Sequence, residues 1–143
     1  MTSMFAVLDT NHFSALVAGG PMAIRMVHKA LSTDADLFTT VVTAQETVQG
    51  WLAVLNREAA GRSQVFAYGR FQRVLKDFQN ITVLPFDAAA ASVFHELQAE
   101  QVRIGTMDLK IAAICIAHDA LLLTRNLVDF EKVPRLRSEN WLD

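Results

Sequence analysis

Short apolar runs that favour β-strands alternate along this chain with longer segments that have helical spacing. The runs lie at residues 4–8, 37–41 and 81–84, and a fourth, in the sequence LLLTRN, ends at Thr124. Strands that alternate with helices predict an α/β fold around a parallel sheet. We expect four or five strands, the fifth near residues 139–141.

Local signals indicate where the helices begin and end. Gly19, Gly20 and Pro21 break one helix and start the next, and Gly61 with Arg62 marks a second break. Three caps are predicted: Thr43 with Glu46 in a capping box, Asp87, and Thr106. We expect helices at residues 11–18, 22–31, 43–59, 63–78, 88–102 and 107–120.

Composition limits the class of protein. The chain has 143 residues, 52% of them hydrophobic, and a net charge of −2, so we expect one globular domain, residues 1–143. The charge argues against a surface that is basic throughout, although a local basic patch stays possible. The lone Cys115 suits a reducing compartment. No stretch has the pattern of a signal peptide or a transmembrane helix, so we expect a soluble cytoplasmic protein.

Four acidic residues stand where the predicted sheet presents the carboxyl ends of its strands. Asp9 ends the first strand, Asp129 lies beyond the fourth, and Glu46 and Asp108 begin helices on the same side. Parallel sheets bind ligands at this edge. Clustered carboxylates raise each other's pKa, and a divalent cation relieves the conflict. The pattern favours Mg²⁺, or Mn²⁺, at a site for phosphodiester hydrolysis.

Each acid also has a structural interpretation that stays open. Asp9 suits a turn or a helix cap, and Glu46 suits the capping box with Thr43. Asp108 suits the positive end of a helix, and Asp129 an ordinary loop.

Other features favour structure over chemistry. The histidines have no metal-ligand spacing, and we expect surface or core positions for His12, His28, His95 and His118. One apolar helix side is expected in the core and comprises Val65, Phe66, Tyr68, Phe71, Val74, Leu75 and Phe78. Four basic residues of the same stretch have two interpretations, a solvated helix face or a nucleic-acid patch: Arg62, Arg70, Arg73 and Lys76.

Three stretches carry a family resemblance: VLDTNHFSAL, TTVVTAQETVQGW and IGTMDLKIAAICIAHDALLLTRNLVDFEKVPRLRSENW. They resemble PIN-domain ribonucleases, and most closely the VapC-type toxins of bacterial toxin–antitoxin systems. They cover almost the whole chain in family order, and the third is the most specific. The resemblance implies a three-layer α/β/α PIN-like fold. It also implies cleavage of single-stranded or looped RNA, such as tRNA or rRNA loops, with Mg²⁺ or Mn²⁺.

The resemblance also implies roles for single residues. The metal ligands fall on Asp9, Glu46 and Asp108, and a positioning hydroxyl falls on Thr124. Many PIN domains have an aspartate two residues after that hydroxyl. Here Asn126 stands there, with Asp129 three residues further on, and either completes the site. The nearest basic residues bind phosphate or form surface salt bridges, namely Lys110 and Arg125.

A toxin of this kind has partners. The resemblance implies a cognate VapB-type antitoxin protein and a homodimer. Four apolar residues on the predicted N-terminal helices could lie either on a partner surface or in the core: Phe13, Leu16, Trp51 and Leu55. The alternative function is a non-catalytic PIN-like module that binds RNA or protein. A Mg²⁺-dependent phosphatase is disfavoured, because Asn11 stands where a second aspartate is needed.

Overall fold

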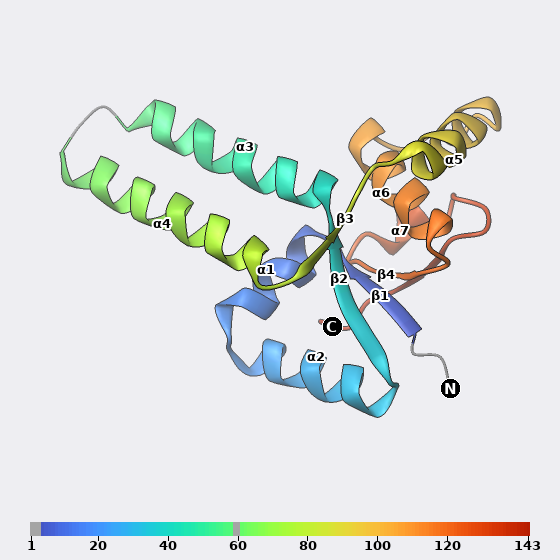
Figure 1. The fold of residues 1–143 in the computed structure, drawn as a ribbon, viewed down its shortest axis with the longest axis horizontal. Coiled ribbons are helices and arrows are strands. Elements are labelled where there is room, and N and C mark those ends of the chain that lie inside the picture. The colour runs from blue at the N-terminus through green and yellow to red at the C-terminus, as the bar shows by residue number, and fades with distance from the viewer. Residues whose placement is uncertain (1–3, 59–60) are drawn as a thin grey trace.

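The computed structural model describes residues 4–58 and 61–143. Within these residues the chain forms five strands and seven helices (Figure 1). In chain order they are β1 (Met4–Leu8), α1 (Thr10–Ala18), α2 (Pro21–Ser32), β2 (Ala35–Thr40), α3 (Val41–Arg57), α4 (Arg62–Gln79), β3 (Thr82–Leu84), α5 (Ala88–Ala99), α6 (Thr106–Ala117), β4 (Leu121–Leu123), α7 (Leu127–Phe130) and β5 (Arg137–Glu139).

The five strands form one parallel sheet in the order β3-β2-β1-β4-β5. The predicted α/β class and parallel sheet are confirmed, with five strands. In the register of the two central strands, Leu8 lies opposite Leu123. Asp9 and Thr124, the next residues of the two strands, therefore leave the sheet side by side. All strands point the same way, so their carboxyl ends share one edge.

Helices cover both faces of the sheet, which gives the three-layer arrangement (Figure 1). Successive strand residues face opposite sides. Val7 and Leu122 pack into a core with α5 and α6, whereas Leu8 and Leu123 pack into a second core with α1, α2 and Trp141. The helices α3 and α4 form a pair that projects beyond the sheet (Figure 1). Among the described residues, no helix has the length and apolar character needed to cross a membrane.

The predicted strands lie within about two residues of the observed ones, and the helix caps differ more. Asp87 caps α5 as predicted, accepting a hydrogen bond from the Ala90 N–H at 3.0 Å. The capping box of Thr43 is wrong: Thr40 is the N-cap of α3 and accepts from the Thr43 N–H at 3.0 Å. Strand β2 runs directly into the helix, so the extended cap residue comes three positions earlier.

Other predicted boundaries also shift. The helix α6 begins at Thr106 itself, and its N-cap is Gly105, so the predicted Thr106 cap is wrong. The helix α5 ends at Ala99, and the short helix α7 was not predicted. The predicted continuation of the third helix to residue 59 lies outside the described residues.

The prediction of a buried apolar side on α4 is wrong for four of its seven residues, three of them in the first half of the helix. The side chains of Val65 and Phe66 are 74% and 66% exposed. Tyr68 and Leu75 are exposed as well. Much of the α3–α4 pair lies away from the sheet, so the sheet core does not cover this side (Figure 1). Near the sheet, Phe78 stacks on Phe13 with ring centroids 4.4 Å apart.

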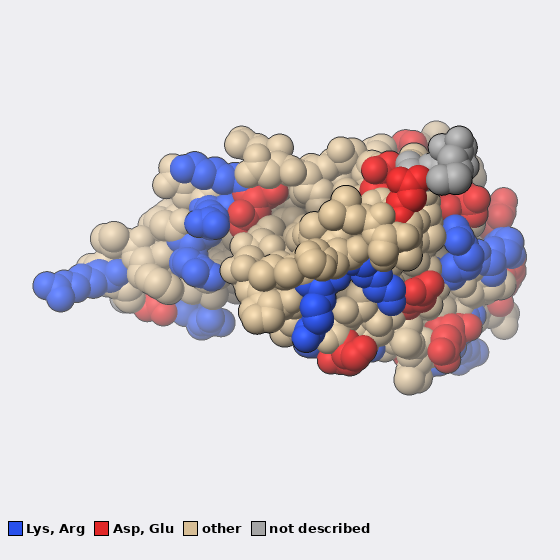
Figure 2. All heavy atoms as spheres, turned by 90° about the horizontal axis from the view of Figure 1, so that it is seen from below, with Lys and Arg blue, Asp and Glu red and all other residues tan. Residues whose placement is uncertain are grey.

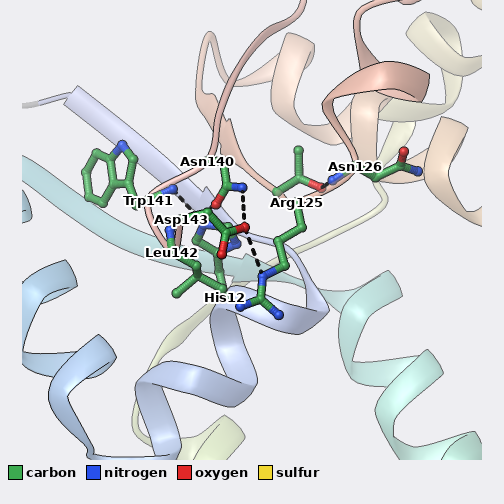
Figure 3. Close-up of polar contacts among 8 residues, drawn as sticks. His12, Arg125, Asn126, Asn140, Trp141, Leu142 and Asp143 are labelled. Atoms are coloured by element: carbon green, nitrogen blue, oxygen red, sulfur yellow. Dashed lines mark hydrogen bonds and ion pairs between the residues drawn. The ribbon is translucent and has the colours of Figure 1, made fainter.

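His12 joins the first helix to the end of the chain (Figure 3). It is fully buried, and its Nε2 accepts a hydrogen bond from the Trp141 N–H at 3.0 Å. This bond assigns the proton to Nδ1, which has no hydrogen-bond partner in the described part of the chain. Burial, together with the charge of Arg125, lowers the pKa of His12 to about 4. A core position for His12 is thus confirmed, and His28 and His95 are exposed.

We predict that His12 makes the stability of the protein depend on pH. The folded-state pKa is about 4 and the usual value is 6.5. The unfolded chain therefore binds more protons between these values, and stability is lost as the pH falls from 6.5 towards 4. Urea denaturation should show that the free energy of unfolding falls between about pH 7 and about pH 5 by about 2 kcal/mol more in the wild type than in His12→Gln. The exposed-site control, His95→Gln, should behave as the wild type, and equal pH slopes for all three proteins would contradict this prediction.

Candidate functional site

Asp9 lies at the carboxyl edge of the sheet, between β1 and α1. It is the N-cap of α1, and its Oδ1 accepts a hydrogen bond from the Thr10 N–H at 2.8 Å. Its Oδ2 accepts from the Thr124 hydroxyl at 3.1 Å. The structural interpretation as a cap is therefore confirmed, and it leaves lone pairs on both oxygens for a further ligand.

Thr124 connects three parts of this edge. Its side chain is buried, and its Oγ1 donates to Asp9 and accepts from the Asn126 N–H at 3.0 Å. The Asp9 N–H in turn donates to the Leu123 carbonyl oxygen at 3.0 Å. One hydroxyl thus holds the ends of β1 and β4 and the start of the following loop in a single arrangement.

Glu46 and Asp108 approach Asp9 from the first two turns of α3 and α6. Burial raises the pKa of Glu46, and the charges of Asp9 and Asp108 raise it further. Burial likewise raises the pKa of Asp108, with contributions from Asp9 and Asp129. The structure therefore brings the predicted acids into one electrostatic field. Because Thr40 is the cap of α3, the capping interpretation of Glu46 no longer accounts for its position.

The environment of Asp9 acts in both directions on its acidity. Burial raises the pKa of Asp9, while the hydrogen bonds from Thr10 and Thr124 lower it. In the described residues no Lys, Arg or His forms an ion pair with Asp9, Glu46 or Asp108. These three carboxylates are therefore uncompensated by protein charges.

Asp129 differs from the other acids. Its Oδ2 accepts from the Asn126 side-chain amide at 3.0 Å, and its Oδ1 lies 3.4 Å from the Lys132 ammonium. These hydrogen bonds lower the pKa of Asp129. Asn126 also caps α7 by accepting from the Asp129 N–H. Sequence reasoning missed Lys132 because α7 was not predicted, so its spacing of three from Asp129 carried no helical signal.

The two basic residues nearest the acids in sequence have other contacts. The Arg125 Nε lies 3.4 Å from Asp143 Oδ2, as Figure 3 shows, which is the predicted salt-bridge alternative. The Lys110 ammonium lies 6.0 Å from the ring centroids of both Phe86 and Phe94.

The donor set fits a hard divalent cation held loosely. Within residues 4–58 and 61–143, no group of three or more His, Cys, Asp or Glu side chains forms a ready-made ligand cluster. The oxygen donors nevertheless share a field without a compensating cation. Mg²⁺ keeps several waters and takes only one or two direct carboxylates, so it does not require a closed protein cage. Cys115 is buried and its thiol pKa is raised, which removes it from the candidate ligands.

Comparison with known proteins adds independent information. A family model described as PIN domain matches residues 6–136. Ribonuclease VapC2 of Haemophilus influenzae is 35% identical over 74 residues, which are 48% of this chain and 56% of that protein. The chain thus spans about half the length of the first relative it matches. The tRNA(fMet)-specific endonuclease VapC of Shigella flexneri is 29% identical over 140 residues, 94% of this chain and 96% of that protein.

Solved structures with the same fold include two toxin–antitoxin complexes. VapBC2 from Rickettsia felis, bound to a DNA fragment from its promoter, superimposes with a TM-score of 0.76 at 23% identity, covering 96% of this chain and 99% of that one. DNA-bound VapBC from Salmonella typhimurium gives 0.73 at 22% identity, covering 98% and 99%. At these identities the likeness shows the fold.

We predict that the Thr124 hydroxyl controls the acidity of Asp9. In Thr124→Val the donor to Asp9 Oδ2 is lost, so the pKa of Asp9 should rise, and the unpaired groups should lower the free energy of unfolding by about 1–3 kcal/mol. The control Thr124→Ser keeps the hydroxyl and should retain both values. Carboxyl carbon chemical shifts, followed by NMR against pH without metal, measure the pKa. An unchanged Asp9 pKa in the valine variant would contradict the assignment.

Proposed function

Because this chain belongs to the PIN domain family, we propose that it is a metal-dependent endoribonuclease, the toxin of a VapBC-type toxin–antitoxin system. The observation that carries the proposal is the meeting of three uncompensated carboxylates, Asp9, Glu46 and Asp108, at the carboxyl edge of the sheet. The relatives, which are a VapC ribonuclease and a tRNA(fMet)-specific VapC endonuclease, support the activity. The substrate class is structured or single-stranded RNA, such as tRNA or rRNA loops.

In this proposal Asp9, Glu46 and Asp108 hold Mg²⁺ directly or through water, with Mn²⁺ as the other candidate. When bound, the cation supplies a water of lowered pKa and stabilises charge on the phosphate. The protein supplies orientation. Thr10 and Thr124 donate to the two oxygens of Asp9 and hold its carboxylate in one direction. Water attack on the phosphate leaves a 5′-phosphate and a 3′-hydroxyl.

The fourth acidic position is shared by two residues. Asp129 carries the negative charge, which reaches Asp108. Asn126 donates to Asp129, and its own N–H donates to Thr124, so it links this carboxylate to the Asp9 side of the site. We assign Asp129 to the attacking water or the outer part of the ligand set, and Asn126 to holding Asp129 in place.

The proposed partners are a VapB-type antitoxin and a second copy of the chain, in the cytoplasm. The solved neighbours from Rickettsia felis and Salmonella typhimurium are VapBC complexes, which supports the antitoxin. Exposed apolar side chains on the helices supply surface for these contacts: Ile24, Leu31, Val65 and Phe66. Two residues that the sequence left open as partner surface are buried, Phe13 and Leu55.

A second candidate function is a non-catalytic module that binds RNA or protein. It is favoured by one observation, the lack of a closed ligand cluster in the described part of the chain. The uncompensated carboxylates argue against it, because acids without a cation repel the phosphates of an RNA.

We predict that RNA cleavage depends on the acids. Asp9→Asn and Asp108→Asn each remove one negative ligand and should lower cleavage of total RNA in Mg²⁺ by about 100-fold or more. Asp119→Asn is the matched control, since Asp119 is a fully exposed acid that pairs with Arg137. Sequencing of the RNA ends after induction identifies the target. Undiminished cleavage by both site variants would rule out the metal assignment.

We also predict that metal binding is visible without catalysis. A cation at about 100 times its Kd stabilises the folded state by about 2.7 kcal/mol, which is roughly 5–10 °C in the melting temperature of a chain this size. Because the pKa values of Asp9, Glu46 and Asp108 are raised, protons compete with Mn²⁺, and the shift should shrink as the pH falls. Calorimetry of the wild type and of Asp9→Asn measures it. An equal shift in both proteins would place the cation elsewhere.

A further inference from the structure

A cavity lies between α1, α3 and α4, outside the acidic site. It has a volume of about 430 Å³, within the range of small-molecule sites. Its walls include Phe13 and Val17 from α1, Trp51 from α3, and Arg70 and Arg73 from α4. None of these residues has a role in the proposed chemistry, so the cavity needs its own explanation.

Two of the helices that wall the cavity also lead to the acidic site, because α1 follows Asp9 and α3 carries Glu46. On α1 the wall residue Ser14 stands five positions after Asp9, and on α3 Trp51 stands five positions after Glu46. At 1.5 Å of rise per residue, each interval is about 7.5 Å. A nucleic-acid strand with one phosphate at the acids therefore reaches the cavity with a neighbouring nucleotide.

The chemistry of the wall suits an unstacked base with its phosphate. The Arg70 guanidinium lies 5.7 Å from the centroid of the Trp51 ring, so a flat cation and a flat aromatic surface stand together. Such pairs stack bases and bind phosphates in single-stranded RNA recognition. Arg73 is paired with Asp77 at 3.3 Å, whereas Arg70 has no acidic partner among the ion pairs of the described residues.

The charge on the surface around the cavity also favours a nucleic acid. Residues 62–79 hold four basic residues and a single acid, Asp77. Figure 2 shows Lys and Arg gathered at the end of the molecule formed by α3 and α4, next to a hollow. The exposed apolar residues Val65 and Phe66 do not line the cavity, so its composition differs from that of the apolar partner surface.

We propose that this cavity is an RNA subsite, in which Trp51 and Arg70 bind a nucleotide next to the one that is cleaved. The inference rests on the proposed ribonuclease function and deepens it by placing part of the substrate. The acids repel the RNA backbone unless a cation is present, so affinity must come from elsewhere on the protein. In the cavity Arg70 supplies a positive charge and Trp51 supplies a stacking surface, five residues along α3 from Glu46.

The test separates binding from cleavage. Binding of a fluorescein-labelled single-stranded RNA of mixed sequence is measured by anisotropy on the full chain carrying Asp108→Asn. Adding Arg70→Gln or Trp51→Leu should weaken binding roughly 10-fold. Arg70→Gln should also reduce the slope of log affinity against log salt by about 0.7. The matched control is Arg62→Gln, the same charge change on the same helix outside the cavity wall, with less than a twofold effect.

Further readouts keep the proposal falsifiable. Arg70 is exposed, so its replacement leaves the fold intact even if the Trp51 variant is unstable. In the otherwise wild-type chain, Arg70→Gln should raise KM for RNA and leave kcat unchanged. Equal affinities for Arg70→Gln and Arg62→Gln would overturn the subsite. The subsite would also be overturned if a segment of a protein partner bound in the cavity while neither cavity variant changed the affinity for RNA.

The experiment also distinguishes this inference from the proposed function. If Asp9→Asn and Asp108→Asn cleave as the wild type does while the cavity variants lose RNA affinity, the metal mechanism fails and the subsite stands. If the acid variants are inactive and the cavity variants bind RNA normally, the ribonuclease proposal stands and the subsite is overturned.

Discussion

The hydrogen bond from Thr124 to Asp9 connects residues 115 positions apart and holds the two central strands together at the site. Its geometry follows from the parallel register of β1 and β4, which places Leu8 opposite Leu123. A slip of one residue in that register would turn the Thr124 hydroxyl to the other face of the sheet. The two cores therefore determine the site, since they require Val7 and Leu8 to face opposite sides.

The site is a local electrostatic cost that the cores must offset. Burial and mutual repulsion raise the pKa values of Glu46 and Asp108, so their charged forms are less stable here than in water. A fold selected only for stability would place a basic residue among them. In the structure Lys132 pairs instead with Asp129, and the inner carboxylates, Asp9, Glu46 and Asp108, have no basic partner among the ion pairs of the described residues. The conflict is confined to the inner acids, as expected where a cation completes the arrangement.

The sequence allowed most of the sheet to be predicted because β1, β2, β3 and β4 each contain a short apolar run bounded by turn or cap residues, whereas β5 is polar. It also allowed the meeting of Asp9 and Thr124 to be predicted, because parallel topology brings the residues after β1 and β4 to one edge. The cap of α3 was misplaced because local patterns do not show where a strand passes directly into a helix. The cap of α6 was misplaced by one residue, since Gly105 takes the cap position before Thr106. Exposure of Phe66 was missed because periodicity gives a helix its apolar side and not what covers that side. The pairing of Trp51 with Arg70 needs the α3–α4 geometry, which no local pattern contains.

Two groups of titrating residues act in opposite directions on stability. His12 has a depressed pKa, so the folded state loses stability as the pH falls below 6.5. Asp9, Glu46 and Asp108 have raised pKa values, so the folded chain binds their protons more readily than the unfolded chain and gains stability as the pH falls through their pKa values. The two contributions partly cancel in the metal-free protein. In the proposed metal-bound state this second contribution disappears, because the cation keeps the carboxylates deprotonated. The metal-bound protein is therefore more sensitive to acid than the metal-free folded protein. Its stability falls with pH both because His12 becomes protonated in the unfolded chain and because the cation dissociates.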